Sequence, residues 1–177
     1  TNENNILHRI INNNDFVLTD VIKTNSPSMD ITISSNFERI LSEFLDTSSL
    51  IDLYQKMPNK DHKKSIDQNA HKNLSNLFTS MSATSDEVIS QIKKTYKNFD
   101  LIVDPHTAVG LVCAEKLEIK GAMCLACAHP IKFQDTVKKS INEDIKYEKN
   151  FKFEHEEKFD LLKNNYPTMK EYIQNHA

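Results

Sequence analysis

Glycine is scarce in this chain, and the scarcity limits what the chain can fold into by itself. Only Gly110 and Gly121 occur among its 177 residues. A loop that cradles a phosphate group with backbone N–H groups needs glycines clustered at the end of a strand. Because these two glycines stand far apart in the sequence, we expect no phosphate-binding loop of that type. A phosphate-bearing ligand would need its anchor from elsewhere.

Composition and charge exclude two classes of partner. The net charge is −3 and the sequence pI is about 6.1, which argues against nucleic acid. Lysine and glutamate alternate in residues 146–158, which is typical of a solvated helix face. No apolar run approaches the roughly 20 residues that span a bilayer, and no charged, apolar leader opens the chain. We therefore expect a cytoplasmic protein without a nucleic-acid or membrane partner.

Three cysteines occur, Cys113, Cys124 and Cys127. An odd number in a chain with no export signal predicts reduced thiols. Cys124 and Cys127 form a C-x-x-C pair, but positions i and i+3 of a strand point to opposite faces. No second pair follows at the spacing of metal ligands, so we expect no metal site.

Apolar spacing predicts a largely helical chain. Ser35 and Glu38 form a capping-box pattern, and Pro167 interrupts the last helical stretch. Residues 16–22 are expected to be extended, residues 47–84 to form a polar helical insertion, and residues 58–64 to be a mobile link within it. The predicted helices cover residues 4–11, 35–45, 50–57, 66–81, 85–96, 104–117, 135–141 and two stretches of 152–177.

One run predicts a strand. Residues 121–128 read Gly-Ala-Met-Cys-Leu-Ala-Cys-Ala, a continuous small and apolar run of strand length, as in strands buried on both faces. Helices are predicted before and after it, which indicates an α/β fold. Ligands of open parallel sheets lie beyond the carboxyl ends of the strands. Residues 1–4 and 127–130 are such ends, so we place the candidate site there.

Several short motifs carry a resemblance to a known family. They are Thr-Asn-Glu-Asn-Asn-Ile-Leu at residues 1–7, Ser-Pro-Ser-Met-Asp at 26–30 with Ser-Ser-Asn-Phe-Glu-Arg at 34–39, Asp-Pro-His-Thr-Ala-Val-Gly at 104–110, and Ala-His-Pro-Ile-Lys-Phe at 128–133. Together and in this order they resemble the carboxyl-terminal part of a threonine synthase. That family uses pyridoxal phosphate to convert O-phosphohomoserine and water into threonine and phosphate, as a carbon–oxygen lyase acting on phosphate.

The resemblance implies a fold and a missing part. It implies the pyridoxal-phosphate fold type II (tryptophan synthase β-like), helix-rich with one or two central strands in this segment. Residues 1–141 would belong to the large cofactor-binding α/β domain, and residues 142–177 would form carboxyl-terminal helices. The family's Schiff-base lysine lies before Thr1, so we expect a fragment that is inactive alone and whose partner is the remainder of the enzyme chain.

The resemblance also implies which residues meet the cofactor. Cys127 stands where the family has a hydroxyl residue in Thr-Ala-His-Pro, facing the pyridine nitrogen. A neutral thiol is a weak donor to that atom; the alternative is a small buried residue, since free cysteine packs as one. Asn2, Asn4 and His129, at the predicted strand ends, are further candidate cofactor contacts.

A second group of residues is predicted to face the substrate. Arg39 and Asn36 lie one turn apart on a helix, and arginine suits a bidentate grip on phosphate or carboxylate. We expect Arg39, with Ser26 or Ser28 on the preceding loop, to face the substrate. The alternative is a surface arginine paired with Glu38, Glu43 or Asp30.

His106 lies in the first turn of a helix that Asp104 and Pro105 begin, where free N–H groups favour anions. It is a candidate for the substrate-phosphate region. The alternative is a packed, hydrogen-bonded histidine that fixes the turn.

Three functions remain open. The first is threonine synthase. The second is a threonine-synthase-like phospholyase that eliminates phosphate without correct addition of water, which Cys127 and the insertion at 47–84 keep open. The third is a non-catalytic remnant of the fold. No G-x-S-x-G motif occurs, so hydrolase chemistry has no support.

Overall fold

The computed structural model describes residues 1–58, 64–145, 156 and 158–176, and these fall into two compact units. The first unit is Thr1–Ile145 and the second is Lys146–Ala177. The division lies a few residues beyond the boundary expected after residue 141. In the described ranges the regular structure is helical, with no strand.

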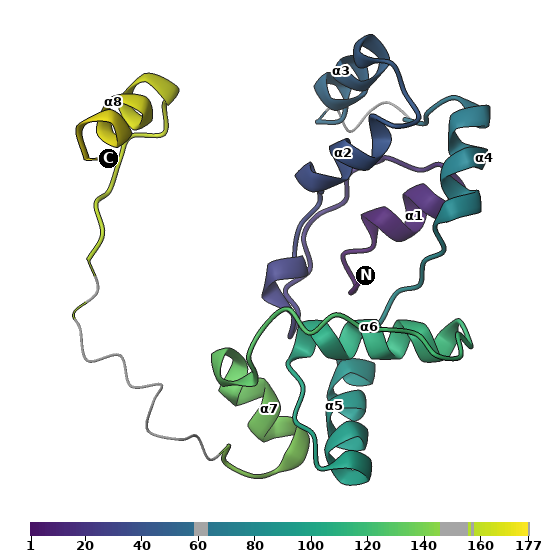
Figure 1. Ribbon diagram of the computed structural model, residues 1–177, viewed down its shortest axis with the longest axis vertical. Coiled ribbons are helices and arrows are strands. Elements are labelled where there is room, and N and C mark those ends of the chain that lie inside the picture. The colour runs from purple at the N-terminus through teal and green to yellow at the C-terminus, as the bar shows by residue number, and fades with distance from the viewer. Residues whose placement is uncertain (59–63, 146–155, 157, 177) are drawn as a thin grey trace. The chain divides into compact units, whose positions relative to one another are not determined.

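The first half of the larger unit packs short helices around one apolar cluster (Figure 1). Ile6 and Ile10 of α1 are buried in it, as the predicted spacing requires. The elements are α1 (Ile6–Asn13), η1 (Pro27–Met29), η2 (Ser35–Phe37), α2 (Glu38–Leu41), α3 (Thr47–Lys56) and α4 (Gln68–Leu77). The two helices expected in the polar insertion are thus α3 and a shorter α4. Of the predicted link at 58–64, residues 59–63 lie outside the described residues.

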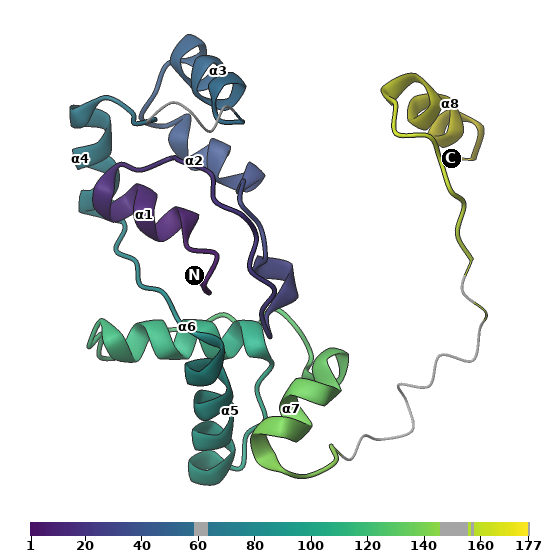
Figure 2. The same ribbon diagram turned by 180° about the vertical axis from the view of Figure 1, so that it is seen from behind.

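The second half of this unit has its own apolar cluster, formed by α5 (Ser85–Phe99) and α6 (Pro105–Lys116). Both views show α7 (Gln134–Ile141) beside α5, with α6 crossing near one end of α5 (Figure 1, Figure 2). The 3₁₀ turn η3 (Pro130–Phe133) leads directly into α7. This arrangement brings η3 and the start of α6 to the same side of the unit as η1.

Helix starts follow capping chemistry, though not everywhere that the sequence predicts it. Asp104 Oδ1 accepts from His106 N at 2.9 Å and Pro105 is in the first turn, which confirms the predicted start of α6. Thr84 and Glu87 form a capping box on α5. The box predicted for Ser35 and Glu38 is wrong, because the chain enters α2 through a 3₁₀ turn without a side-chain cap.

The strand predicted at residues 121–128 does not form. Residues 122–127 make no backbone–backbone hydrogen bond to another described residue, and Met123 is 90% exposed and Leu125 75% exposed. A strand exists only where a neighbour accepts and donates along its backbone, and the described residues supply none. The extended piece expected at 16–22 likewise has no strand partner.

The smaller unit contains α8 (Tyr166–His176). Pro167 does not break a helix here, because it lies in the first turn of α8, where a missing N–H costs nothing. Residues 158–165 contain no helix, and the rest of the helix predicted before Pro167 lies outside the described residues. Tyr172 donates to the Asp160 carboxylate and stacks on His176 with ring centroids 4.1 Å apart.

Within the described ranges, the longest helices remain too short or too polar to cross a membrane.

Candidate functional site

A carboxylate that sequence reasoning missed is the centre of a polar network at the amino-terminal end. Asp30 Oδ1 accepts from Asn2 Nδ2 at 2.8 Å, from Asn4 Nδ2 at 3.0 Å and from the Thr24 hydroxyl at 2.6 Å. Asp30 Oδ2 accepts from Thr24 N at 2.8 Å. The carboxylate therefore ties the first residues of the chain to the loop at 22–30. In the sequence Asp30 is the last residue of the Ser-Pro-Ser-Met-Asp motif, but that motif does not predict these hydrogen-bond partners.

The predicted cofactor contacts Asn2 and Asn4 lie inside this network. Asn2 is 2% exposed, donates to the Ser26 hydroxyl at 3.0 Å and accepts from Asn4 N at 2.9 Å. The Asn4 side chain donates to Ile22 O and accepts from Ile22 N, both at 2.8 Å. Buried amides need such partners. These side chains, and that of Ser26, therefore hold the loop in place.

His106 joins the first turn of α6 to the η1 turn. Its Nδ1 lies 2.8 Å from Oδ1 of Asp104, which is 1% exposed, and its Nε2 accepts from Ser28 N at 3.2 Å. A backbone amide can only donate, so Nε2 carries no proton, and the ring is the neutral tautomer that donates from Nδ1 to Asp104. The Thr107 hydroxyl donates to the other Asp104 oxygen.

The same imidazole also packs on η3. The ring centroids of His106 and Phe133 lie 4.7 Å apart with a tilt of 57°. From the start of α6, the His106 side chain thus contacts two segments that are distant from it in the sequence, the η1 turn and η3. This is the geometry of a packed, hydrogen-bonded histidine.

A cleft of about 650 Å³ lies between the loop at 23–27 and the segment at 131–136. Ser28 directly follows the loop at 23–27, and Phe133 belongs to the segment at 131–136. The contacts of His106 with these two residues therefore lie at this cleft. Two lysines and one aspartate give the lining a positive balance. The lining residues are Lys23, Thr24, Asn25, Pro27, Ile131, Lys132, Phe133, Gln134, Asp135 and Thr136.

The Cys127 thiol is exposed rather than buried. Its sulfur contacts the carbonyl of Leu125 at 3.9 Å. His129, two residues on, is the N-cap of η3, and its Nδ1 accepts from Ile131 N at 3.2 Å. Cys127 therefore lies on a segment without regular structure, and His129 caps the turn that carries Phe133.

Asn36 and Arg39 are exposed on η2 and α2 and take no part in either set of contacts. Across the part of the chain that the structure describes, Arg39 forms no ion pair, so the pairing with Glu38, Glu43 or Asp30 that was the alternative to a substrate contact is not seen. The structure brings Ser28 and His106 together at the cleft but does not bring Arg39 to them.

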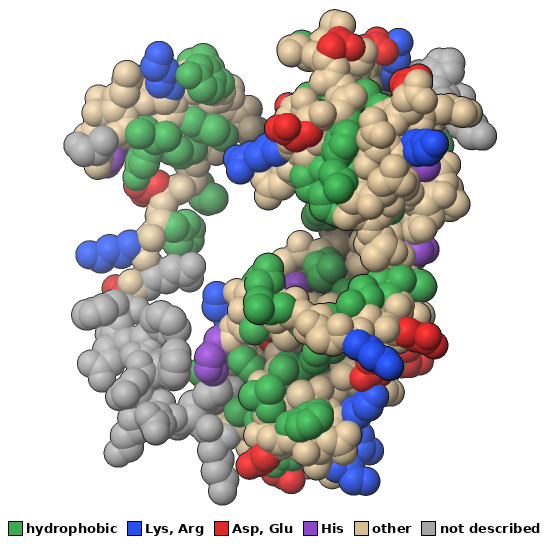
Figure 3. Space-filling view, turned by 45° about the vertical axis from the view of Figure 1, so that its right-hand side comes forward, with side chains coloured by type: hydrophobic (Ala, Val, Ile, Leu, Met, Phe, Trp, Pro, Cys, Tyr) green, Lys and Arg blue, Asp and Glu red, His purple; other side chains and the backbone are tan. Residues whose placement is uncertain are grey.

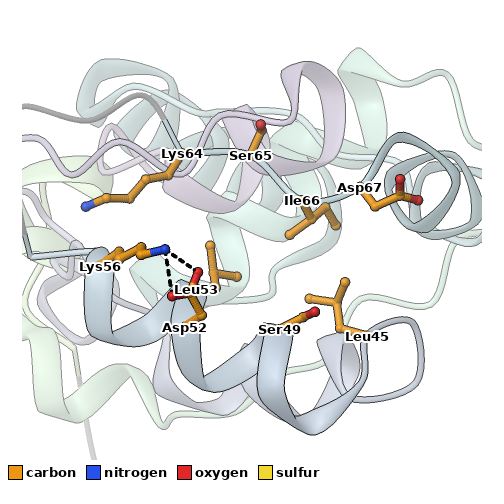
Figure 4. A pocket seen from close by; sticks show the side chains of 9 residues that line it. All are labelled: Leu45, Ser49, Asp52, Leu53, Lys56, Lys64, Ser65, Ile66 and Asp67. Carbon is orange, nitrogen blue, oxygen red and sulfur yellow. Dashed lines mark hydrogen bonds and ion pairs between the residues drawn. The ribbon is translucent and has the colours of Figure 1, made fainter.

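A second cleft, of about 370 Å³, lies on the polar insertion (Figure 4). Lys56 and Asp52 of α3 form an ion pair of 2.6 Å across one side of it, and both side chains are more than half exposed. On the opposite side, the Asn14 side chain holds the backbone of Ile66: its Nδ2 donates to Ile66 O and its Oδ1 accepts from Ile66 N. None of the residues predicted from the sequence lines this cleft.

The described residues offer a candidate contact for the pyridine ring of pyridoxal phosphate but no glycine loop for its phosphate group. Gly110 lies in the middle of α6 against Cys124, and Gly121 occupies a turn with φ of 73°, so neither contributes to a phosphate-binding loop. The Cys127 thiol suits a ring nitrogen as a neutral donor. No group of three or more possible metal ligands occurs among the residues that the structure describes.

Comparison with known proteins identifies the family. The family model "Threonine synthase, C-terminal" matches residues 107–173. The threonine synthase of Saccharomyces cerevisiae is 32% identical over 186 residues, which cover 92% of this chain and 36% of that protein. The threonine synthase of Pseudomonas aeruginosa is 31% identical over 149 residues, which cover 79% of this chain and 31% of that protein. The chain belongs to the threonine synthase family.

A solved structure agrees over nearly the whole chain. The PLP-bound threonine synthase of Brucella melitensis matches with a TM-score of 0.80 and 30% identity, covering 99% of this chain and 39% of that one. The expected fold family is thereby confirmed for this helix-rich segment. The chain spans about a third of the length of the curated relatives it matches.

Proposed function

We propose that the complete protein that contains this chain is a threonine synthase, which converts O-phospho-L-homoserine and water into L-threonine and phosphate. The likeness to enzymes of that name over nearly all of this chain carries the proposal. The cofactor is pyridoxal phosphate, which when bound acts as an electron sink for charge that develops on the substrate.

The residues of this chain supply positioning and polarity. The Cys127 thiol is a neutral, weak donor for the pyridine nitrogen, so it leaves that ring without the full positive charge that a carboxylate partner would stabilise. Asn2 and Asn4 act through the loop at 22–30, which they hold by their bonds to Asp30 and Ile22. His129 acts through η3, whose first turn it caps.

Arg39 is proposed to face the substrate, with Asn36 beside it. Its guanidinium is exposed and unpaired among the described residues, so it is available for a phosphate or carboxylate. Arg39→Ala in the complete enzyme is expected to raise KM for O-phosphohomoserine. An unchanged KM would remove Arg39 from the substrate site.

The remainder of the enzyme chain is the proposed partner of this segment. Residues 122–127 are mostly apolar and make no backbone–backbone hydrogen bond to another described residue, so their N–H and C=O groups can pair with a strand of the remainder of the chain. Hydrophobic side chains also lie open on the surface of the larger unit (Figure 3). Phe99, Leu101, Ile119, Met123 and Leu125 are among those exposed.

Phosphate release and product analysis test the proposal. The complete protein with pyridoxal phosphate and O-phosphohomoserine is expected to release phosphate and threonine in equal amounts, and the 177-residue chain alone is expected to release neither. A keto acid in place of threonine would identify the phospholyase that the thiol at Cys127 keeps open. No phosphate from the complete protein would indicate a non-catalytic remnant.

A further inference from the structure

We infer that Cys124 and Cys127 are a redox site, which forms a disulfide bond on oxidation, and that this bond and the docking of residues 122–127 as a strand exclude each other. The docking part of the inference rests on the proposed function. The disulfide itself does not, because it follows from the conformation of this chain and from its three free thiols.

The absence of the expected strand removes the geometric argument against a bridge between these cysteines. In a strand, the Cα atoms of residues i and i+3 stand about 10 Å apart and their side chains point to opposite faces. A disulfide joins Cα atoms that lie about 4.4–6.8 Å apart. Residues 122–127 have no regular secondary structure and no backbone–backbone hydrogen bond to another described residue. No strand pairing within the described chain therefore holds the two cysteines apart.

The two residues between the cysteines can form a turn. The ends of a β-turn lie closer than about 7 Å, and its type I form accepts most residues, so the span of a turn matches that of a disulfide. Leu125 and Ala126 are both exposed. A turn at these residues therefore breaks no buried apolar contact, and Cys127 can approach Cys124.

The two thiols differ in access. Cys127 is exposed and Cys124 is half-buried, while every other residue of 121–127 is exposed. Cys124 lies against α6, where its sulfur is 3.9 Å from the point that a Cβ on Gly110 would occupy. It lines a groove of about 780 Å³ together with Leu111 and Ala114. Because access decides which sulfur reacts first, we assign the first reaction to Cys127 and the second to Cys124.

The third cysteine has different surroundings. Cys113 is half-buried, and its thiol donates to Met81 O at 3.3 Å. It is not among the described residues that line the groove beside Cys124. We therefore expect Cys113 to remain a thiol when the other two cysteines are oxidised.

A small disulfide such as oxidised glutathione supplies the oxidant. The Cys127 thiolate attacks one glutathione sulfur, which forms a mixed disulfide and releases one glutathione thiolate. The Cys124 thiolate then attacks the Cys127 sulfur and releases the second glutathione. The two protein thiols give up two electrons and two protons, and the oxidised glutathione ends as two thiols.

The bridge and the strand compete for the same four residues. A disulfide between Cys124 and Cys127 holds their Cα atoms too close for a strand, so the oxidised chain cannot pair along this segment. Pairing as a strand would in turn hold the two sulfurs too far apart to react. Oxidation also removes the S–H group with which Cys127 is proposed to meet the pyridine nitrogen.

The experiment compares this 177-residue chain with the complete protein in a glutathione buffer in which the thiol exceeds the disulfide. A mixed disulfide on a lone cysteine is then largely reduced again. Peptide mapping of the 177-residue chain should show a link between Cys124 and Cys127, with Cys113 still open to alkylation. The oxidised chain should lose its co-purification with a separately expressed remainder of the enzyme, and a thiol reductant should restore it. The complete protein should keep all three thiols in the same buffer.

Two variants serve as controls. Cys124→Ala leaves Cys127 without a partner, so in this buffer it should stay reduced and keep its co-purification with the remainder. Cys113→Ser should form the same link as the wild type and lose co-purification on oxidation to the same extent.

Three results would overturn the inference: no link between Cys124 and Cys127, a link that includes Cys113, or an oxidised chain that co-purifies as well as the reduced one. A reduced chain that does not co-purify either would overturn the competition with docking. The proposed function fails separately, when the complete protein forms no threonine while the link still forms in the 177-residue chain and blocks its docking.

Discussion

Replacing Asp30 by alanine removes the acceptor that ties the amino-terminal residues to the loop at 22–30. Three of its four donors keep or can find another partner: Asn2 Nδ2 still has the Ser26 hydroxyl, Asn4 Nδ2 still has Ile22 O, and the Thr24 hydroxyl can rotate. The backbone amide of Thr24 keeps none of its bonds. Loss of charged hydrogen bonds and one stranded amide together cost about 2–4 kcal/mol. We expect the free energy of local opening at 22–30 to fall by that amount.

Native-state hydrogen exchange of the complete protein measures this opening energy directly. Asp52→Ala is the matched control, since it removes an aspartate whose ion pair with Lys56 is largely exposed and contributes about 0–1 kcal/mol. Protection at Thr24 that is the same in Asp30→Ala, Asp52→Ala and the wild type would refute the account of the network.

Three further predictions follow from particular contacts. Thr84→Ala removes half of the capping box of α5 and should lower stability by about 1 kcal/mol, which thermal unfolding of the complete protein would detect. The hydrogen bond from Lys116 and that from the Thr84 amide hold the pKa of Glu87 below its usual 4.5. That stabilisation is present above pH 4.5 and is lost as the pH falls through the lowered pKa, so the difference in melting temperature between the wild type and Lys116→Gln should shrink between pH 7 and pH 3. Leu125→Asp places a charge on the exposed apolar segment and should abolish co-purification of this chain with a separately expressed remainder of the enzyme; intact co-purification would contradict the proposed strand docking.

The sequence alone predicts a helix correctly where the groups that stabilise it lie within that helix. Asp104 followed by Pro105 predicts the start of α6, because the cap and the missing N–H act within a single turn. The spacing of Ile6 and Ile10 predicts α1 for the same reason. A capping pattern in the sequence fails as a predictor where the chain enters the helix through another turn, as at Ser35, which belongs to a 3₁₀ turn without a side-chain cap.

Long-range features could not be derived from the chain alone. The run at 121–128 has the composition of a buried strand, yet strand formation depends on neighbours that the described residues do not provide. The role of Asp30 depends on partners six to 28 positions away in the sequence, and no local pattern encodes them. His106 was found as a candidate from its helix position, but its contacts with Ser28 and Phe133 needed the fold.

The central claim is that this chain completes an enzyme that adds water to a carbon skeleton after phosphate has left it. The most direct measurement is turnover of O-phosphohomoserine by the complete protein in ¹⁸O-labelled water, with mass analysis of the amino-acid product. We predict threonine that carries the label in its hydroxyl group and one phosphate released for each molecule formed. Release of phosphate with a keto acid as the product, or threonine with an unlabelled hydroxyl, would contradict the account.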